Sequence, residues 1–342
     1  MILQSIGILI GIFVVYLLIV ALAPCFSVPK QRLDGAKQVP NEVDAIPSQP
    51  REDVTFQVNG TSISAWLYLP GELSAPVPCI VLGHGFGGTK DMLLEHYAIR
   101  YQKAGYAVLA FDYRHFGESE GQPRQLFLIR YQLEDCEGAI KYARSRKEVD
   151  PARIALWGTS AGGGYGIVIA SKDKDIACVV AHCPGLDHKA SVKMFRRTLG
   201  IRHILRLVVH AQRDLMRSRL GLSPHKIPIV GKPGTMAFLP ISDAYDGYSK
   251  VVSESFINEV CARVILRSHG FNPVKHIHNV DCPVLIQICD HDSLAPIRTE
   301  TEEELRKYAE VKRYPIGHFD IYIGSNFEKA VSNQLEFFRE HL

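Results

Sequence analysis

Short apolar runs alternate with helical patterns along most of the chain. The runs that predict buried strands, rich in Val, Ile, Leu and Ala, lie at residues 79–82, 106–111, 153–157, 177–183 and 284–289. The clearest helical patterns lie at residues 91–103, 126–144 and 327–341. Strands that alternate with helices predict an α/β fold with a mostly parallel central sheet and helices on both faces.

An antiparallel hairpin is expected at the start of this fold. Residues 55–58 and 62–69 have strand composition and flank Asn59-Gly60, a pair that favours a tight hairpin turn. We therefore expect the compact domain to begin near Arg51.

The alternation stops between residues 183 and 284. These roughly 100 residues are mainly helical in pattern, which predicts an inserted helical cap. The expected organisation is a first core part at 51–184, a cap at 185–280 and a second core part at 281–342.

The N-terminal pattern differs from the rest of the chain. Residues 5–24 carry no charged side chain, and a helix of that length would be about 30 Å long, enough to cross a bilayer. A cleaved signal peptide lacks support because no Lys or Arg precedes the run. A lipoprotein signal ending at Cys25 has the same weakness, and Pro24 also counts against it. We therefore expect a retained transmembrane anchor at 1–24, followed by a Pro-rich linker at 25–50.

Positive charges after this run predict its orientation. Lys30, Arg32 and Lys37 follow it, whereas only the α-amine precedes it. By the positive-inside rule, the catalytic domain of this single-pass protein is expected to face the cytoplasm.

Composition narrows the class of protein. Hydrophobic residues make up 46% of the chain, as in folded globular proteins, and the net charge of +3 gives no general case for nucleic-acid binding. The eight cysteines form no CxxC pair and no Cys/His zinc spacing. Free thiols in a reducing compartment are the favoured interpretation, and no structural metal is expected.

A candidate nucleophile lies between an apolar run and a helical pattern. Residues 158–162 read Gly-Thr-Ser-Ala-Gly. Glycine two positions before and after Ser160 suits a strand-to-helix turn too tight for a Cβ at either site. Such a turn would present the Ser160 hydroxyl at a helix N-terminus. By itself the pattern could also be an ordinary turn.

A serine nucleophile needs a base, and the base needs an acid to orient it. Asp290 and Asp292 both follow the predicted strand at 284–289, so either could lie at the sheet edge that carries Ser160. Asp292 is preferred because it lies further into the loop. His318 follows after room for a helix at 298–309 and a short strand, and it is the candidate base.

The oxyanion formed during acyl transfer needs hydrogen-bond donors. The candidates are the backbone N–H groups of Ala161, directly after the serine, and of Phe86, after the His84-Gly85 turn. The glycine-rich stretch 83–88 could instead bind phosphate. It lacks both the Lys-Ser/Thr ending of a P-loop and the GxGxxG register of a dinucleotide site.

Taken together, these motifs resemble the α/β-hydrolase family over roughly residues 52–342, apart from the cap. The resemblance is carried by the stretches at 84–87, 112–119, 158–162, 292–296 and 317–320. It implies Ser160 as nucleophile, Asp292 as acid and His318 as base. One departure is His115, where relatives usually have glycine. The chain is similar to bacterial serine hydrolases often grouped with Xaa-Pro peptidases, dienelactone hydrolases and broad esterases.

The expected activity is hydrolysis of carboxylic esters through an acyl-enzyme, without metal or organic cofactor. A peptidase, thioesterase or acyltransferase could use the same three residues. A non-catalytic binding module is the alternative from a different class, but such proteins normally lose one of the three residues.

The predicted cap carries a strongly basic stretch. Residues 189–232 contain eleven Lys and Arg residues against Asp214 alone, a net charge of +10, interleaved with apolar residues. The simpler interpretation is a solvated basic helix face. The alternative is that this face rests on anionic lipid beside the N-terminal anchor.

Overall fold

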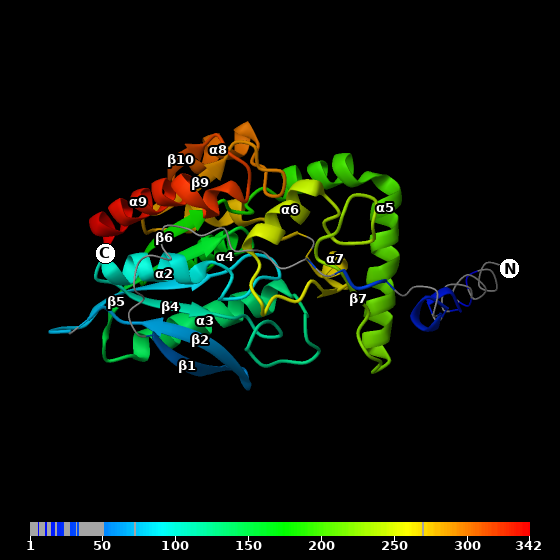
Figure 1. The fold of residues 1–342 in the computed structure, drawn as a ribbon, viewed down its shortest axis with the longest axis horizontal. Helices are drawn as coiled ribbons and strands as arrows, with labels where there is room; N and C mark the ends of the chain where they lie inside the picture. The colour runs from blue at the N-terminus through cyan, green and yellow to red at the C-terminus, as the bar shows by residue number, and fades with distance from the viewer. Residues whose placement is uncertain are drawn as a thin grey trace.

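The computed structural model describes residues 6, 11, 15–17, 19–23, 28–31, 33, 51–71, 73–268 and 270–342. Its main strands are β1 (Arg51–Val58), β2 (Thr61–Tyr68), β3 (Val77–Gly83), β4 (Ala107–Phe111), β5 (Val149–Thr159), β6 (Ile176–His182), β9 (Val284–Cys289) and β10 (Glu310–Tyr314). They form one eight-stranded sheet in the order β1-β2-β4-β3-β5-β6-β9-β10 (Figure 1).

The sheet is mostly parallel, as the alternation predicts. Only the β1–β2 and β2–β4 pairs are antiparallel. The predicted hairpin turn is present: Asn59 and Gly60 have φ angles of 48° and 78° and join Val58 to its partner Thr61. Asn and Gly tolerate this left-handed backbone better than other residues.

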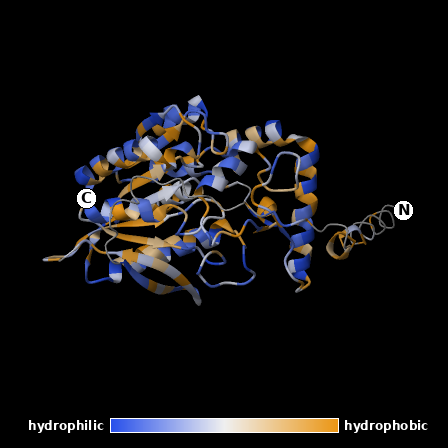
Figure 2. Ribbon diagram, viewed as in Figure 1, coloured by the Kyte–Doolittle hydropathy of each residue, from blue (hydrophilic) through white to orange (hydrophobic). Residues whose placement is uncertain are grey.

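Helices cover both faces of the sheet. On one face, α2 (Leu94–Lys103) and α9 (Gly324–His341) contact each other. On the other face, α3 (Ile129–Ser145) packs against α4 (Ala161–Ala170). Strands β4 and β9 are buried at every residue, which explains why their sequences are apolar except at Gln287. Figure 2 shows hydrophobic strands of the sheet between the covering helices.

Two predicted elements begin elsewhere than their patterns indicate. The helix expected from residue 91 begins at Leu94, because Leu93 has a φ of 65°, which no α-helix can include. The strand expected from residue 153 begins at Val149, which pairs with Val77.

The segment between β6 and β9 is mainly helical. It contains α5 (His188–Arg219), α6 (Ser242–Val251), α7 (Val264–Arg267) and the 3-10 helix η3 (Pro273–Asn279). The sequence pattern did not predict its small antiparallel pair, β7 (Lys226–Ile227) and β8 (Val260–Cys261). The long helix α5 bends at Gly200, whose φ of 71° and ψ of 159° are not helical.

Half of the predicted membrane span at 5–24, and most of the predicted linker at 25–50, lies outside the described residues. Among the helices that are described, none has the length and apolar character needed to cross a membrane. Val20 and Ala21 are described and buried, and their carbonyls accept hydrogen bonds from Arg213 and Arg217 of α5. The anchor stays a prediction.

Seven cysteines fall within the described residues and all are free thiols. Six are buried, and burial raises the pKa of Cys79 to about 12 and that of Cys183 to about 12. These thiols therefore stay protonated and inert near neutral pH.

Candidate active site

Ser160 lies at a sharp turn between β5 and α4. Its φ of 53° and ψ of −116° are rarely adopted by residues other than glycine. The turn is held on both sides, because the Ser160 N–H donates to the His182 carbonyl and the Ser160 carbonyl accepts from Gly185 N–H, both at 2.9 Å.

The flanking glycines leave no room for side chains. A Cβ at Gly158 would lie 2.2 Å from the carbonyl oxygen of Gly162, and one at Gly162 would lie 2.6 Å from the carbonyl oxygen of Gly83. Gly85 is close as well, since its Cβ would lie 3.1 Å from Ser160 Cβ. The turn therefore has the crowding that the Gly-Thr-Ser-Ala-Gly pattern predicts.

Asp292 and His318 are brought together by the loops after β9 and β10. His318 Nδ1 and Asp292 Oδ2 are 2.6 Å apart, and both side chains are only 4% exposed. The other carboxylate oxygen of Asp292 accepts the N–H groups of Leu294 and Ala295 at 2.8 and 2.6 Å. Because Nδ1 of His318 faces Asp292, the other ring nitrogen, Nε2, points away from this carboxylate.

Burial alone would raise the pKa of Asp292, but its partners reverse the effect. The charge and hydrogen bond of His318, with the two backbone N–H groups, lower the pKa below its usual value of 3.8. Asp292 is therefore ionised at neutral pH and can stabilise a protonated His318.

The alternative acid, Asp290, points elsewhere. Its carboxylate pairs with Arg313 at 2.8 Å on a partly exposed surface. Of the two aspartates after β9, only Asp292 contacts the histidine within the described part of the chain.

Ser160 and His318 line one cavity of about 280 Å³. Phe86 and Ala161 line it too, so the structure gathers four of the five candidate residues around one space. Ala161 is the first residue of α4, where a helix has no internal acceptor for its N–H. The walls are mostly aromatic and aliphatic, and include Met92, Leu93, Phe127, Phe195, Phe238, Leu239, Phe271 and Phe319.

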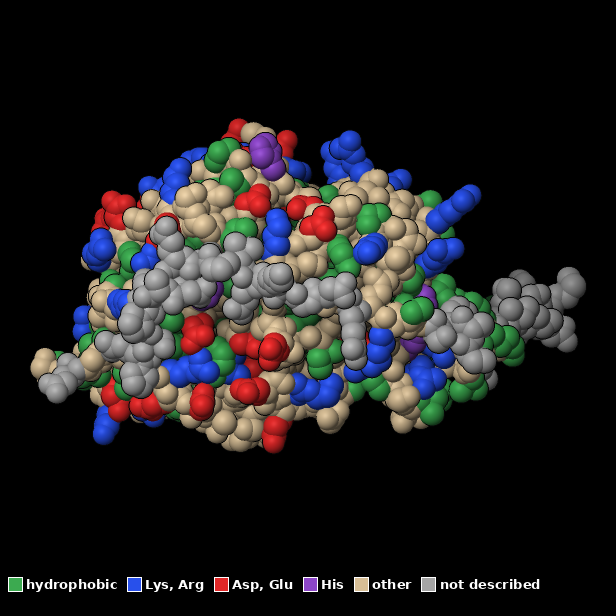
Figure 3. All heavy atoms as spheres, in the orientation of Figure 1, with side chains coloured by type: hydrophobic (Ala, Val, Ile, Leu, Met, Phe, Trp, Pro, Cys, Tyr) green, Lys and Arg blue, Asp and Glu red, His purple; other side chains and the backbone are tan. Residues whose placement is uncertain are grey.

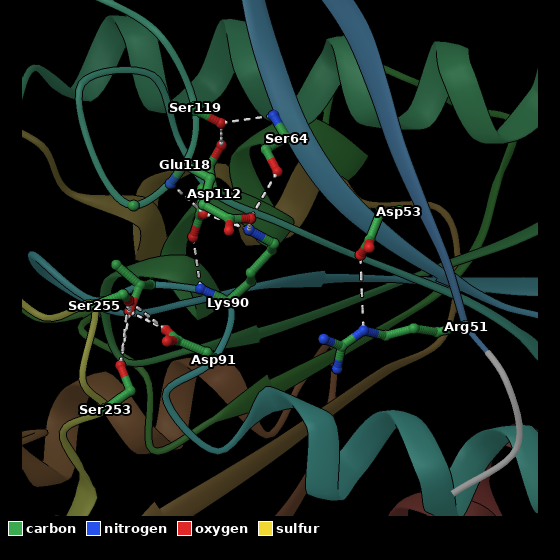
Figure 4. Close-up of polar contacts among 12 residues, drawn as sticks. Arg51, Asp53, Ser64, Lys90, Asp91, Asp112, Glu118, Ser119, Ser253 and Ser255 are labelled. Atoms are coloured by element: carbon green, nitrogen blue, oxygen red, sulfur yellow. Dashed lines mark hydrogen bonds and ion pairs between the residues drawn. The ribbon is translucent and has the colours of Figure 1, made fainter.

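A polar network around Asp112 holds Lys90, shortly after the turn that carries Phe86 (Figure 4). The carboxylate of Asp112 accepts the backbone N–H of Lys90 at 2.6 Å, the Lys90 ammonium at 2.7 Å and the Glu118 N–H at 2.9 Å. Gly117 is required beside it, because a Cβ there would lie 2.2 Å from Asp112 Oδ2. The motif at 112–119 thus holds Lys90, two residues after the turn at 83–88.

His115, the departure from the family pattern, has a φ of 73°. Glycine adopts this backbone most readily, which accounts for the usual residue at this position. Burial lowers the pKa of His115 to about 4, so its ring is neutral at physiological pH. The ring contacts Tyr131.

Helix α6 contacts all three loops of the site. Tyr248 OH donates to the Phe86 carbonyl at 2.8 Å, and the Tyr248 ring lies 5.3 Å from that of Phe319, next to His318. Asp243, at the start of α6, accepts a hydrogen bond from Ser293 in the acid loop. The sequence analysis identified none of these α6 residues, because the sequence of α6 does not indicate which loops the helix contacts.

The fold and this arrangement of a serine, a histidine and a carboxylate define a class of protein. A family model described as the alpha/beta hydrolase fold matches residues 78–210. A relative at 39% identity, described below, matches far more of the chain. The chain belongs to the α/β-hydrolase family.

Individual relatives are similar over nearly their whole length. The quorum-quenching protein AidA of Acinetobacter baumannii is 39% identical over 292 residues, which cover 84% of this chain and 94% of AidA. The thiohydrolase aneE of Aspergillus aculeatus is 26% identical and covers 83% of this chain and 91% of its own. The polyketide transferase grgF of a Penicillium species is 26% identical over 86% of this chain and 97% of its own.

A solved structure has the same fold. The crystal structure of the α/β hydrolase GrgF from Penicillium sp. superposes with a TM-score of 0.70, at 24% identity, over 86% of this chain and 99% of that chain.

Proposed function

We propose that this chain is a serine hydrolase that cleaves carboxylic esters through an acyl-enzyme on Ser160. The observation that carries the proposal is the 2.6 Å contact between Asp292 and His318, with His318 lining the same cavity as Ser160. A strained serine beside a histidine that is oriented by a buried carboxylate has the parts that acyl transfer requires.

The proposed reaction has two halves. His318 removes the Ser160 proton as the oxygen attacks the acyl carbon, and the N–H groups of Phe86 and Ala161 stabilise the oxyanion. His318 then gives that proton to the leaving alkoxide, which departs as an alcohol. Water, deprotonated by His318, repeats the attack and releases the carboxylic acid and free Ser160.

The apolar cavity favours an acyl group without charge. We expect p-nitrophenyl esters with short to medium acyl chains to be hydrolysed, with kcat/KM rising with chain length until the cavity of about 280 Å³ is filled. An activity with no dependence on chain length would contradict binding of the acyl group in this cavity.

Thioester hydrolysis or acyl transfer to another acceptor is the second candidate. It is supported by the similarity to proteins named thiohydrolase and polyketide transferase. A thiolate leaves a tetrahedral intermediate more readily than an alkoxide, so attack by Ser160 would cleave a thioester as well. A comparison of kcat/KM for an ester and a thioester of one acyl group separates the two candidates.

We also propose that residues 1–24 anchor the chain in a membrane, with the catalytic domain facing the cytoplasm. The support is the uncharged run at 5–24 and the Lys and Arg residues after it. The full chain should then sediment with membranes and resist an alkaline carbonate wash. Release by the wash would contradict an anchor. Contact of the basic stretch 189–232 with anionic lipid is a further part of this proposal.

A further inference from the structure

A second concave surface, the α5 groove, lies next to the catalytic cavity. It has a volume of about 520 Å³. Its walls are one face of α5 and the loop that follows Asp292, and they comprise Ala190, Lys193, Met194, Arg197, Thr198, Pro296, Ile297 and Arg298.

The groove and the cavity share the first half of α5 as a wall. His188, Ser191 and Phe195 line the cavity, whereas Lys193, Met194 and Arg197 line the groove. At 3.6 residues per turn, these two sets project from roughly opposite sides of the helix. The acid loop is shared too, because Leu294 lines the cavity while Pro296–Arg298 line the groove.

The groove carries positive charge that the protein does not neutralise. Arg298 pairs with Asp187, Nε to Oδ2 at 2.7 Å. Lys193 and Arg197 lie one turn apart on α5, and neither forms an ion pair within the described part of the chain. Among the residues that the structure describes, none of those lining the groove is acidic. Figure 3 shows Lys and Arg side chains standing out at the upper right, over α5.

Two adjacent cations that lack a carboxylate partner are suited to a phosphate group. A helix with its side chains is about 10–12 Å thick, so the groove lies roughly that far from the cavity wall. A flexible substrate chain that joins an acyl group to a phosphate can span such a distance. One substrate could therefore place its acyl group in the cavity and a phosphate-bearing tail in the groove.

We propose that the α5 groove binds the phosphate groups of a nucleotide-type thioester, such as an acyl-coenzyme A, whose acyl group enters the catalytic cavity. The inference rests on the proposed acyl-transfer chemistry of Ser160. In that reaction the acyl carbon bonds to Ser160 Oγ, the C–S bond breaks, and the thiolate takes from His318 the proton that came from Ser160. Water then cleaves the new ester and releases the acid.

The test compares two thioesters with the same acyl group. Butyryl-coenzyme A carries phosphates, and S-butyryl-N-acetylcysteamine does not. The full chain is assayed as wild type, as the groove variant Lys193→Ala/Arg197→Ala, and as the control Arg196→Ala/Arg202→Ala. The control removes the same charge from exposed positions of α5 outside the groove.

For the groove variant we expect KM for butyryl-coenzyme A to rise about tenfold or more, since each lost charge-assisted hydrogen bond weakens binding appreciably. KM for the phosphate-free thioester should not change, and the control variant should behave as wild type with both substrates. An equal effect of both variants would indicate diffuse charge and overturn the proposal. So would a groove variant that weakens both thioesters alike.

A vesicle assay separates the thioester from a lipid as the source of phosphate. The groove variant and the control variant, which lose the same charge, should bind phosphatidylglycerol vesicles equally. If the groove variant alone loses vesicle binding while its kinetics with butyryl-coenzyme A stay those of wild type, the groove binds lipid headgroups and the thioester proposal is wrong. Hydrolysis of p-nitrophenyl butyrate by the same variants monitors the proposed function independently of the groove.

Discussion

At the residue scale, Ser160 depends on neighbours that have no side chain. A Cβ at Gly158 would lie 2.2 Å from the carbonyl oxygen of Gly162, which is backbone and cannot rotate away. We expect Gly158→Ala to lower the free energy of unfolding by about 1–3 kcal/mol, the usual cost of overpacking, and to lower activity by displacing Ser160. Gly71→Ala is the matched control, since no atom of the described residues beyond its chain neighbours lies within 4 Å of its added Cβ. Urea titrations of both variants would show the difference, and equal stabilities would contradict the crowding argument.

The two aspartates after β9 offer a second matched pair. Asp292→Asn removes the charge beside His318 Nδ1 and can favour the wrong ring tautomer, so kcat should fall about 10³–10⁴-fold. Asp290→Asn removes a charge that pairs with Arg313 instead, so kcat should stay within about twofold, in line with the small worth of an exposed ion pair. Steady-state ester hydrolysis by the two variants decides which carboxylate serves the site. A larger loss in Asp290→Asn would reverse the assignment.

The lowered pKa of Asp292 also predicts a pH dependence of stability. Because its folded pKa lies below the unfolded value, the ionised carboxylate stabilises the fold above about pH 4, and this contribution is lost as the pH falls through the folded pKa. The difference in unfolding free energy between wild type and Asp292→Asn should therefore shrink as the pH falls from about 4 toward 3. A difference that grows on acidification would contradict the sign of the shift.

At the scale of elements, α6 joins the loops that carry the acid, the base and the oxyanion donor. Its Tyr248 OH donates to the Phe86 carbonyl at 2.8 Å. We expect Tyr248→Phe to lower kcat about tenfold through a displaced Phe86 N–H, with KM little changed. Tyr245→Phe on the same helix is the control, since its ring lies near Lys232 instead. A rise in KM for Tyr248→Phe alone, with kcat unchanged, would show that Tyr248 acts only on substrate binding.

Elements of the sheet could be predicted because each has its own apolar pattern. The runs at 106–111 and 284–289 are buried on both faces, and Gln287 is the only amide or charged side chain in them. Gln287 is fully buried but bonds to Tyr314 OH and the Ala330 carbonyl. The two-residue strands β7 and β8 have no such pattern, since they are too short to show a period.

At the scale of the whole molecule, the parallel sheet explains why the candidate site could be predicted in part. The turns after β3, β5, β9 and β10 all leave the carboxyl ends of parallel strands, so Phe86, Ser160, Asp292 and His318 were expected at one edge. The long segment between β6 and β9 follows no such rule. Its contributions, such as Phe195, Phe238 and Tyr248, depend on how α5 and α6 pack over that edge, which the sequence pattern does not show.

The central claim is that Ser160 is the nucleophile of an acyl-transfer reaction. A fluorophosphonate probe phosphonylates a serine only where a base activates it and an oxyanion site receives the product. The full-length wild type should be labelled on Ser160, and Ser160→Ala should be unlabelled, with ester hydrolysis reduced about 10⁴-fold or more. Undiminished labelling of Ser160→Ala would contradict the account.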